Sequence, residues 1–592
     1  MKTSMEKMED DSIIYKEVIV VGNGPSGIIT SLMLSGRLPY FVSREHPDEM
    51  LSARLKTLRS PCLITQDLAF LAQGLEGRST NPVSLLMDAL LHPCADLGLD
   101  LQPLVEFKPA GKEIDHLVLG RGPPGGSWHR IDPDVLTLSL GSWMSLPEKP
   151  FPSRSANENR AFSRDVASYY ENYAKEMQLT KYFENDAVVT SVIRLGGNES
   201  ELITLGDEEV LKKRNMWVKK LDRDVSERVK DYFVPLNEDQ ENRCFVTTAL
   251  NCLLARYPRR TRACKRRSHQ AKSESIIIPK HERKKPCSCC GDTDFNNKSP
   301  KPHLFHSHSL DTFSKPTVPF YCKLNSTPSL HSNSSESPNW LIESINSETN
   351  TITKYTCKYL VLACGSYDSP NRLDIFGKGE DPEWLIHDLR KLENRLDEKL
   401  AEEDGEMDPV LVVGAGLSAA DAVMAVRSRN VPVVHVFRGR SAEFTKQLPE
   451  NMYPEYHKVR QMMNDGGSTY PLYAAYPEHS LTDFDPESQV VVLTAKSGDL
   501  VKVQISFAAV LIGSRPNLSF MPPDAKLGVF PDKDIDSKSN PVDINPLTHE
   551  VNGHEGLFAV GPLAGDNFVR YIPGGAVAVV AELYRKKGLV EG

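Results

Sequence analysis

The chain has 592 residues, of which 40% are hydrophobic and 25% charged, and its formal net charge is −9. A chain of this length can bury more than one hydrophobic core, so we expect several domains. The acidic balance argues against nucleic-acid binding by the core. No stretch approaches the roughly 18 apolar residues of a membrane span, and the first residues lack the apolar core of a signal peptide. The 11 cysteines show no regular spacing, which predicts reduced thiols in an intracellular protein. We expect the protein to be cytoplasmic.

The first predicted element is an aliphatic strand at residues 18–21, which leads through a glycine-rich turn into a small-residue helix at residues 28–34. We name Gly22–Gly27 the N-terminal glycine turn. Its spacing is that of the dinucleotide fingerprint: one glycine makes a tight turn, a second lets the backbone approach a pyrophosphate, and a third lets the helix pack on the strand. The helix N-terminus then faces the phosphates. The predicted nucleotide contacts are Gly22, Gly24, Pro25, Ser26 and Gly27.

A carboxylate about 20 residues beyond such a turn binds the ribose of FAD or NAD. The next strand is expected at Tyr40–Ser43, and Glu45 is the nearest carboxylate, although it lies past the end of that strand. A surface glutamate without a ligand is the alternative interpretation.

Helices are expected at residues 84–91 and 161–177, and between them lies Gly120–Trp128, which we name the Gly-Trp loop. Glycines beside a tryptophan allow the backbone to approach a flat aromatic ligand, which makes Gly126 and Trp128 candidate cofactor contacts. A loop with a partly buried tryptophan would explain the same residues without a ligand.

The composition changes after a strand expected at residues 187–195. Residues 206–336 are basic and rich in Ser, Asn, His and Pro. They cannot bury enough apolar surface to offset their ordering entropy, which predicts a largely disordered insertion. Its basic patch, residues 258–267, resembles a localisation signal, and it predicts a nuclear fraction and protein partners. A solvated run of charge is the alternative.

The insertion also holds Cys287, Cys289 and Cys290, with histidines nearby. They lack the paired Cys-x₂-Cys units of a zinc site, so no metal is expected. Strands are expected to resume at residues 340–345, 351–355 and 359–365. The insertion therefore opens a strand-to-strand connection, where long insertions are tolerated.

A second glycine turn, Gly414–Ala419, follows a strand at residues 410–413 and precedes a helix at residues 420–426. We name it the central glycine turn. Its candidate contacts are Gly414, Gly416 and Ser418. Two such turns predict two nucleotides in one protein.

The strand after the central glycine turn, residues 432–437, ends at Arg438, where an acidic residue would bind the ribose of NADH. An arginine there can pair with a 2′-phosphate through its planar fork of donors, which favours NADPH. A solvated charged turn is the alternative.

The two glycine turns in this order, the Gly-Trp loop and Val361–Pro370 resemble class B flavin-containing monooxygenases. Val361–Pro370 resembles their Ala-Thr-Gly strand and linker, with Cys364 in place of threonine, and it adds Gly365 to the cofactor contacts. Residues 63–68 are similar to the N-hydroxylating branch that acts on ornithine or lysine.

More specifically, the chain outside the insertion resembles the oxidative stress-induced growth inhibitor family, most clearly at residues 22–27, 120–128 and 561–575. The resemblance implies an FAD domain with an inserted NADPH domain and a role in restraining growth under oxidative stress. For one branch of the family it suggests germ-cell maturation and meiosis.

The C-terminal part predicts strands at residues 507–513 and 557–561 and a helix at about 575–584. In flavoproteins with two dinucleotides a late strand ends in Gly-Asp, and the next helix directs its positive end at the flavin. Here Gly561 is followed by Pro562, and the nearest aspartate is Asp566. Asp566 either contacts the flavin or caps its own loop. Gly561 and Gly574 are the last cofactor candidates.

The class signature Phe-x-Gly…His has no match, because Phe376-Gly377 and His387 have the wrong spacing. We interpret His387 as a helix or surface histidine and assign no catalytic residue.

We therefore predict an α/β fold with two Rossmann-like dinucleotide-binding domains. Residues 1–12 are expected to be a disordered N-terminus. The FAD domain is discontinuous, formed by residues 13–205, 337–375 and 506–592. The NADPH domain, residues 376–505, is inserted into it, and residues 206–336 form the basic low-complexity insertion.

The function expected from these features is that of an NADPH-dependent FAD monooxygenase that oxidises a soft nucleophile: an amine, a thioether or a protein side chain. The alternative is a non-catalytic flavin- and NADPH-binding regulator of cell growth. A disulfide reductase is disfavoured, because it needs a cysteine pair beside the flavin.

Overall fold

The computed structural model describes residues 13–97, 99, 101–152, 160–195, 339–373, 375, 382–402, 407–440, 448–485 and 487–590. These residues form two Rossmann-like α/β units, each with its own sheet of mainly parallel strands, and the N-terminal unit is discontinuous in sequence. The predicted fold class is therefore confirmed, whereas the domain boundaries remain predictions.

The N-terminal unit is built on a large sheet of seven strands in the order β7-β4-β1-β10-β9-β8, with β21 paired to β10. β1 lies between β4 and β10 and runs parallel to both. Its residues Val18–Val21 are buried, as expected for a strand covered on both faces. The strands are β1 (Ile14–Val21), β4 (His116–Leu119), β7 (Phe183–Glu184), β8 (Ala187–Arg194), β9 (Trp340–Asn346), β10 (Ile352–Leu362) and β21 (Leu557–Ala559).

Two of the expected strands, residues 351–355 and 359–365, are parts of the single strand β10. The residues between them keep the two-residue period of a strand, because Tyr355, Cys357 and Tyr359 are all buried.

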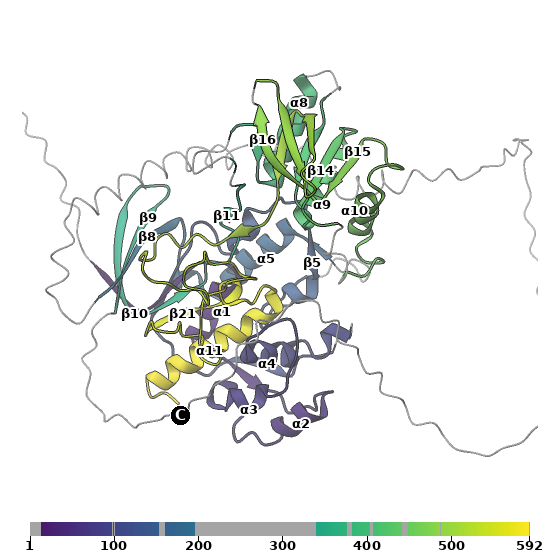
Figure 1. Ribbon diagram of the computed structural model, residues 1–592. Helices are drawn as coiled ribbons and strands as arrows, with labels where there is room; N and C mark the ends of the chain where they lie inside the picture. Colours follow the sequence, from purple (N-terminus) through teal and green to yellow (C-terminus); the bar gives the residue numbers. More distant parts are fainter. Residues whose placement is uncertain are drawn as a thin grey trace, which may run out of the picture. The chain divides into compact units, whose positions relative to one another are not determined.

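Three helices pack on one face of the large sheet, and Figure 1 shows α11 beside α1 and α4. They are α1 (Pro25–Leu34), α4 (Pro82–Leu91) and α11 (Ile572–Lys586). Ile28 and Val577 belong to the core beneath them, together with Val18 and Val20. The alternate residues Ile19 and Val21 face a second core on the other side of the sheet.

Smaller elements complete this unit. α2 (Glu49–Leu55) and α3 (Leu68–Ala72) precede α4, and α5 (Ser163–Glu176) precedes β7. Two antiparallel pairs lie outside the large sheet: β2 (Arg37–Phe41) with β3 (Val105–Pro109), and β5 (Leu136–Leu140) with β6 (Arg160–Phe162).

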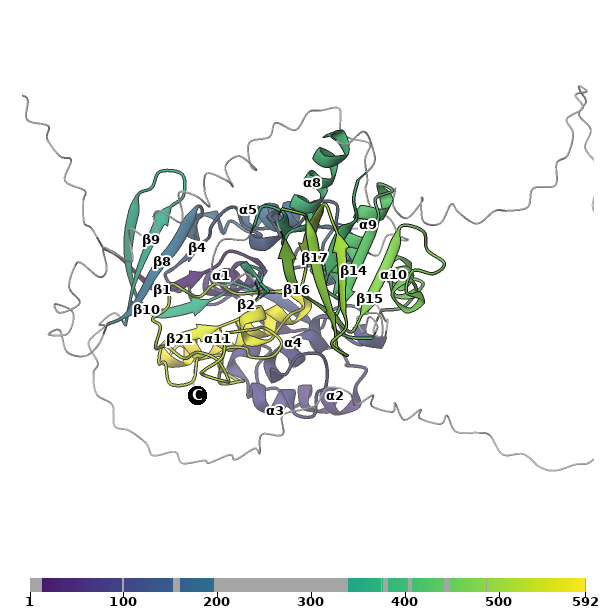
Figure 2. The same cartoon turned by 45° about the horizontal axis from the view of Figure 1, so that its top comes forward.

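The second unit is built on a five-stranded parallel sheet in the order β12-β19-β13-β14-β15. Figure 2 shows β14 and β15 of this sheet with α9 and α10. Its helices form one hydrophobic core with alternate residues of β13. The other residues of β13 form a second core with an antiparallel meander, β16-β17-β18. The strands are β12 (Leu385–Ile386), β13 (Val410–Val413), β14 (Val433–Phe437), β15 (Tyr473–Pro477), β16 (His479–Asp485), β17 (Val490–Ala495), β18 (Leu500–Gln504) and β19 (Phe507–Val510). The helices are α8 (Leu389–Glu402), α9 (Leu417–Ser428) and α10 (Pro454–Asp465).

The chain passes from the large sheet to the five-stranded sheet and back through two short strands that pair with each other. β11 (Ser369–Pro370) and β20 (Ser514–Arg515) are antiparallel, with Ser369 opposite Arg515. The outgoing and returning segments are thus held together by backbone hydrogen bonds.

The chain leaves β8 and returns in β9, and these two strands are antiparallel neighbours. Arg194 lies opposite Trp340, and the Leu195 N–H donates to the Asn339 carbonyl at 2.8 Å. The predicted strand-to-strand connection is therefore present. The basic patch and the cysteines at 287–290 lie outside the described residues.

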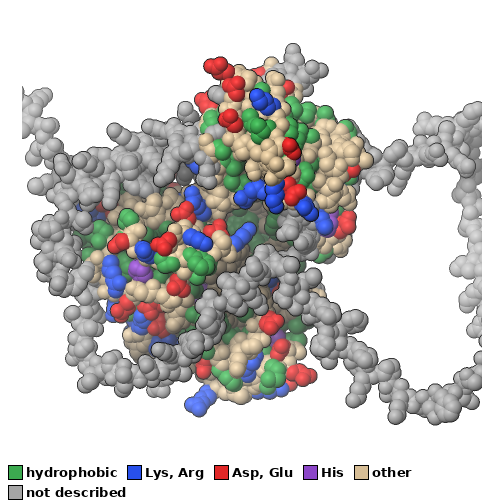
Figure 3. Space-filling model, viewed as in Figure 1, with side chains coloured by type: hydrophobic (Ala, Val, Ile, Leu, Met, Phe, Trp, Pro, Cys, Tyr) green, Lys and Arg blue, Asp and Glu red, His purple; other side chains and the backbone are tan. Residues whose placement is uncertain are grey.

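No helix among the described residues is both long enough and apolar enough to cross a membrane. On the face shown in Figure 3, acidic, basic and apolar side chains of the described residues are interspersed.

Candidate functional site

The N-terminal glycine turn joins β1 to α1, and its three glycines have different surroundings. A Cβ on Gly22, whose φ is +112°, would collide with the Ala363 carbonyl, and a Cβ on Gly27 would collide with the carbonyl of Gly22. A Cβ on Gly24 would meet nothing within 4 Å. Protein atoms therefore require glycine at two positions, and the middle one borders open space, as a close approach by a ligand requires.

The central glycine turn joins β13 to α9 and repeats this arrangement. Gly414 has φ +136°, and a Cβ there would collide with the Leu511 carbonyl, whereas a Cβ on Gly416 would meet nothing within 4 Å. The third glycine is replaced by Ala419. Ser418 is exposed at the start of α9.

The N-termini of α1 and α9 are both free of side-chain competitors for an anion. Gly24 and Gly416 are the N-cap residues, neither cap is closed by a side-chain hydrogen bond, and neither first helical turn contains an acidic residue. Pro25 occupies the first position of α1, and Ser26 is buried beside it. The first N–H groups of each helix are thus available to a phosphate.

The Gly-Trp loop lies against the N-terminal glycine turn. Asn23 donates from Nδ2 to the Gly122 carbonyl at 2.5 Å, and its own carbonyl accepts from the Gly125 N–H at 2.9 Å. A Cβ on Gly126 would stand 2.9 Å from Gly24 Cα. The structure thus brings two predicted cofactor contacts, Gly24 and Gly126, together.

Trp128 is partly buried and packs on the core of the N-terminal unit, with its ring centroid 6.4 Å from that of Tyr170. This packing matches the alternative interpretation of a partly buried tryptophan, and its contact with a cofactor stays a prediction.

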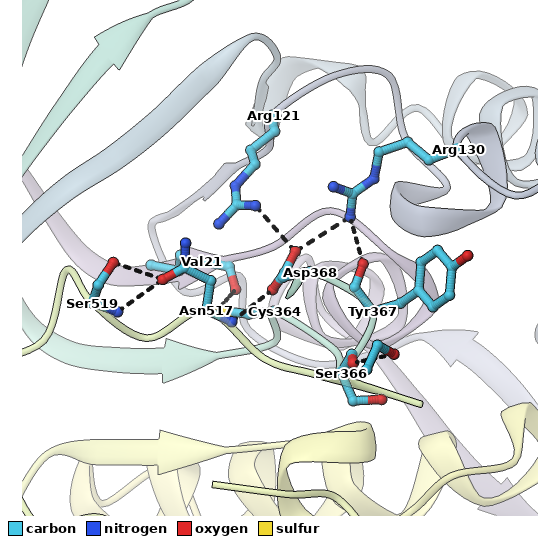
Figure 4. A network of polar contacts seen from close by, with 10 residues as sticks. Val21, Arg121, Arg130, Cys364, Ser366, Tyr367, Asp368, Asn517 and Ser519 are labelled. Carbon is cyan, nitrogen blue, oxygen red and sulfur yellow. Dashed lines mark hydrogen bonds and ion pairs between the residues drawn. The ribbon is translucent and has the colours of Figure 1, made fainter. Parts of the chain in front are cut away.

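Gly365 lies in the linker after β10, where φ is +73° and a Cβ would meet nothing within 4 Å. Three residues later, the side chain of Asp368 is only 4% exposed. Its carboxylate accepts from Arg121 Nη1 at 3.0 Å, from Arg130 Nη2 at 3.3 Å and from the Asn517 N–H at 3.2 Å (Figure 4). Because Arg121 belongs to the Gly-Trp loop, Asp368 ties the linker to that loop.

Cys364, next to Gly365, donates from Sγ to the Val21 carbonyl at 3.4 Å. Burial raises the pKa of its thiol to about 12. The side chain is therefore a neutral thiol at physiological pH that fixes the linker to β1.

Glu45 is exposed and pairs with Lys56 at 2.8 Å. The strand before it, β2, lies outside the large sheet, where β4 takes the place beside β1. The residues that follow the strand beside β1 are therefore those of the Gly-Trp loop. The ribose contact predicted for Glu45 gains no support from this arrangement and remains a prediction.

Arg438 follows β14 directly, and β14 is the neighbour of β13 in the five-stranded sheet. Its side chain is exposed, and the structure gives it no partner among the described residues. Arg440, also exposed, pairs with Glu478 at 3.2 Å. Arg438 thus occupies the position from which a side chain reaches the ribose in this fold.

Asp566 is 1% exposed and accepts three side-chain hydrogen bonds. Ser79 donates at 2.5 Å, Ser84 at 2.7 Å and Asn81 at 3.1 Å. Burial raises the pKa of its carboxyl group, and the nearby His549, followed by these donors, acts in the opposite direction. All three donors are protein groups at the start of α4, so the geometry favours a structural role.

Gly561 and Gly574 both make close protein contacts. A Cβ on Gly561, whose φ is +67°, would collide with Ser26 Oγ, and a Cβ on Gly574 would collide with the backbone of Ser84. Gly561 therefore brings the segment after β21 against the N-terminal glycine turn, and Gly574 lets α11 pack closely on α4.

His387 lies in the loop between β12 and α8 and is partly buried, with Nδ1 3.0 Å from the Val510 carbonyl. It is therefore neither helical nor fully exposed, because the short strand β12 places it beside β19. Phe376 and Gly377 lie outside the described residues. No group of three metal-ligating side chains gathers in the part of the chain that the structure describes.

Sequence reasoning missed Asn23 and Asp368. A polar residue between two glycines of a turn was a signal for Asn23. The sequence contains no signal for the role of Asp368, because its partners come from segments about 150 to 250 residues away.

Several known proteins are similar to this chain. Residues 343–561 match the family described as pyridine nucleotide-disulphide oxidoreductase. Oxidative stress-induced growth inhibitor 2 of Homo sapiens is 33% identical to this chain, with 98% of the chain and 96% of the relative covered. Oxidative stress-induced growth inhibitor 1 of Mus musculus is also 33% identical, with 96% and 95% covered. The solved structure of bacillithiol disulfide reductase from Bacillus cereus has a TM-score of 0.47 at 12% identity, with 96% of this chain and 99% of that one covered.

Proposed function

The chain belongs to the oxidative stress-induced growth inhibitor family, and from this premise we propose that it is an NADPH-dependent FAD enzyme of monooxygenase type. The observation that carries the proposal is the repeated geometry of the two glycine turns. In each, the middle glycine borders open space at the uncapped N-terminus of a helix. The match of residues 343–561 to pyridine nucleotide-disulphide oxidoreductases supports a flavin oxidoreductase in the wider sense.

FAD is assigned to the N-terminal glycine turn. Gly24 and the first N–H groups of α1 would hold its pyrophosphate, and the Gly-Trp loop and Gly365 would border the rest of the molecule. Asp368 acts here as a positioning residue, because it ties Arg121 of the Gly-Trp loop to the linker. When bound, the flavin supplies hydride acceptance and the activation of oxygen.

NADPH is assigned to the central glycine turn. Gly416 and the start of α9 would hold its pyrophosphate, and Arg438 would pair with the 2′-phosphate. The position of Arg438 directly after the strand beside β13, without a competing partner among the described residues, supports this assignment.

The description of the matched family also suggests a disulfide reductase. The described cysteines Cys62, Cys94, Cys357 and Cys364 are all free. Burial raises the pKa of the thiols of Cys62, Cys357 and Cys364, whereas an exchanging cysteine needs a lowered one. These residues therefore do not support disulfide exchange.

A regulator that holds its nucleotides without turnover is the second candidate. Asp566, the aspartate nearest to the expected Gly-Asp position, is fully engaged by protein donors. The family name fits this candidate as well as the first, and on either we infer a cytoplasmic protein that restrains growth under oxidative stress. Its substrate would be a small molecule or a protein side chain.

The visible spectrum of the purified chain separates these possibilities. We expect a bound flavin, released as FAD on denaturation, that NADPH bleaches in the absence of air. Oxygen consumption and product formation with amines and thioethers then test the monooxygenase assignment. A flavin that NADPH leaves oxidised would favour the regulator, and a chain without flavin would refute both.

A further inference from the structure

A histidine occupies the middle of β14, whose other residues are valine and phenylalanine. His435 is 1% exposed, and both ring nitrogens have partners. Nε2 lies 2.7 Å from the carbonyl oxygen of Gly414, and Nδ1 lies 2.8 Å from the hydroxyl of Tyr473 in β15. The ring therefore links the central glycine turn to the next strand of the sheet.

The partners fix the positions of the protons. A carbonyl oxygen can only accept, so Nε2 carries the hydrogen and Nδ1 accepts from the Tyr473 hydroxyl. Burial lowers the pKa of His435 to about 4, so the ring is neutral at physiological pH. The Gly414 N–H donates to the Val436 carbonyl at 2.9 Å. β14 thus forms hydrogen bonds with both the N–H and the carbonyl group of Gly414.

The N-terminal glycine turn lacks this histidine. In the large sheet Val20 pairs with Val118, and in the five-stranded sheet Val412 pairs with His435. Val20 and Val412 each lie two residues before the first glycine of their turn. Val118 is therefore the counterpart of His435. Val118 Cγ1 lies 3.6 Å from the position of a Cβ on Gly27.

The two turns also differ at their third small residue. The carbonyl oxygen of Gly22 lies 1.9 Å from the position of a Cβ on Gly27, which is too close for a methyl group there. Ala419, the counterpart of Gly27, carries that methyl group, so the Gly414 carbonyl cannot take the same place. It is directed instead to the hydrogen-bond donor on His435. The same turn is thus built in two ways. The N-terminal unit uses Gly27 and Val118, and the second unit uses Ala419 and His435.

We propose that His435, held by Tyr473, is a positioning residue that fixes the Gly414 carbonyl in the orientation that Ala419 imposes, and so sets the central glycine turn for the pyrophosphate of NADPH. The identity of the ligand rests on the proposed function. The coupling between His435 and Ala419 rests on the contacts of the chain alone.

Loss of His435 leaves the buried carbonyl of Gly414 without its hydrogen-bond donor. The methyl group of Ala419 still prevents this carbonyl from adopting the orientation seen at Gly22. A glycine at position 419 removes that methyl group and lets the carbonyl adopt the orientation seen at Gly22. The defect caused by losing His435 is therefore expected to be suppressed by Ala419→Gly.

The test uses the full chain in four forms: the parent, His435→Val with Tyr473→Phe, Ala419→Gly, and all three substitutions together. Tyr473 is changed with His435 so that its hydroxyl is not left unpaired. NADPH affinity, FAD content and the midpoint of chemical unfolding are measured for each. We expect the His435/Tyr473 variant to bind NADPH about tenfold more weakly, with FAD retained, and the triple variant to recover to within about threefold of the parent.

A matched control is available in the N-terminal unit. His116 is equally buried, with Nε2 2.8 Å from Ser31 Oγ and Nδ1 2.8 Å from the Ile114 carbonyl, and burial also lowers its pKa to about 4. It touches no glycine of either turn through these bonds. His116→Val with Ser31→Ala should leave NADPH affinity unchanged, which separates the positioning role from the loss of any buried histidine.

Additive effects of the His435/Tyr473 and Ala419 substitutions, on both affinity and unfolding midpoint, would overturn the inference. If the parent binds no NADPH, the proposed function fails, and the unfolding midpoints alone decide the inference. Suppression by Ala419→Gly would then support it, and simple additivity would refute it.

Discussion

Arg440 pairs with Glu478 at 3.2 Å, whereas Arg438, two residues earlier, has no partner among the described residues. The two arginines are both exposed and close in sequence, but only Arg438 directly follows the strand beside β13. We therefore expect Arg438, and not Arg440, to recognise a nucleotide phosphate.

Arg438→Ala is expected to weaken NADPH binding about ten- to a hundredfold, because a charge-assisted pair contributes about 1.5–3 kcal/mol. NADH binding should change little. Titration of the flavin absorbance with each nucleotide measures both. Arg440→Ala is the matched control and should leave the preference intact. Equal loss in the two variants would point to general charge and not to a 2′-phosphate contact.

Gly24→Ala and Gly416→Ala are predicted to act on separate nucleotides. Each glycine has φ near −70° to −86° and open space where a Cβ would lie, so alanine fits the protein without strain. The added methyl group would instead occupy the space that a pyrophosphate needs. We expect the first variant to lose FAD and the second to keep FAD but bind NADPH poorly, with unchanged circular dichroism. A Gly24→Ala chain purified with full FAD would contradict the assignment.

Asp566→Ala is predicted to destabilise the protein by about 3 kcal/mol or more, because Ser79, Asn81 and Ser84 would lose a buried acceptor. The free energy of unfolding should fall in the flavin-free protein as well as in the flavin-bound one. If only the flavin-bound form is affected, Asp566 contacts the flavin, and the structural role is wrong.

Cys364→Ser is expected to leave NADPH-driven bleaching of the flavin intact, since burial keeps the Cys364 thiol protonated, with a pKa of about 12. Native protein should react slowly with iodoacetamide at this position and rapidly after unfolding. Loss of bleaching in a variant that retains FAD would reopen the disulfide reductase hypothesis.

The buried histidine in β14 predicts a pH effect on stability. Burial lowers the pKa of His435 from 6.5 to about 4, so the unfolded chain binds this proton more readily than the folded one. The contribution of His435 is fully present above about pH 6.5, and it is lost as the pH falls toward 4. Unfolding midpoints should decline between pH 7 and 5 less steeply in His435→Gln than in the parent. Parallel declines would show that His435 does not titrate on unfolding.

The sequence was sufficient to locate both glycine turns, because each is a pattern of residues close in sequence between a strand and a helix. It also located Arg438, since that residue directly follows a strand. The role of Glu45 could not be judged in this way, because the order of strands in a sheet is set by tertiary contacts. The structure shows β4, and not β2, beside β1.

The side chains that support the two glycine turns could not be predicted from the sequence either. Asn23 binds Gly122, 99 residues away, and His435 depends on Tyr473, 38 residues away. Nothing in the local pattern identifies either partner. A lone histidine in an apolar strand does indicate that some partner must exist, because a buried imidazole needs its hydrogen bonds.

The hydrogen bond between Leu195 and Asn339 holds the ends of β8 and β9 at the spacing of an ordinary hairpin. A short hairpin turn in place of residues 196–338 would therefore leave the register of the large sheet unchanged. We therefore expect that the length of the connection between Leu195 and Asn339 can change without moving the strand that precedes the N-terminal glycine turn.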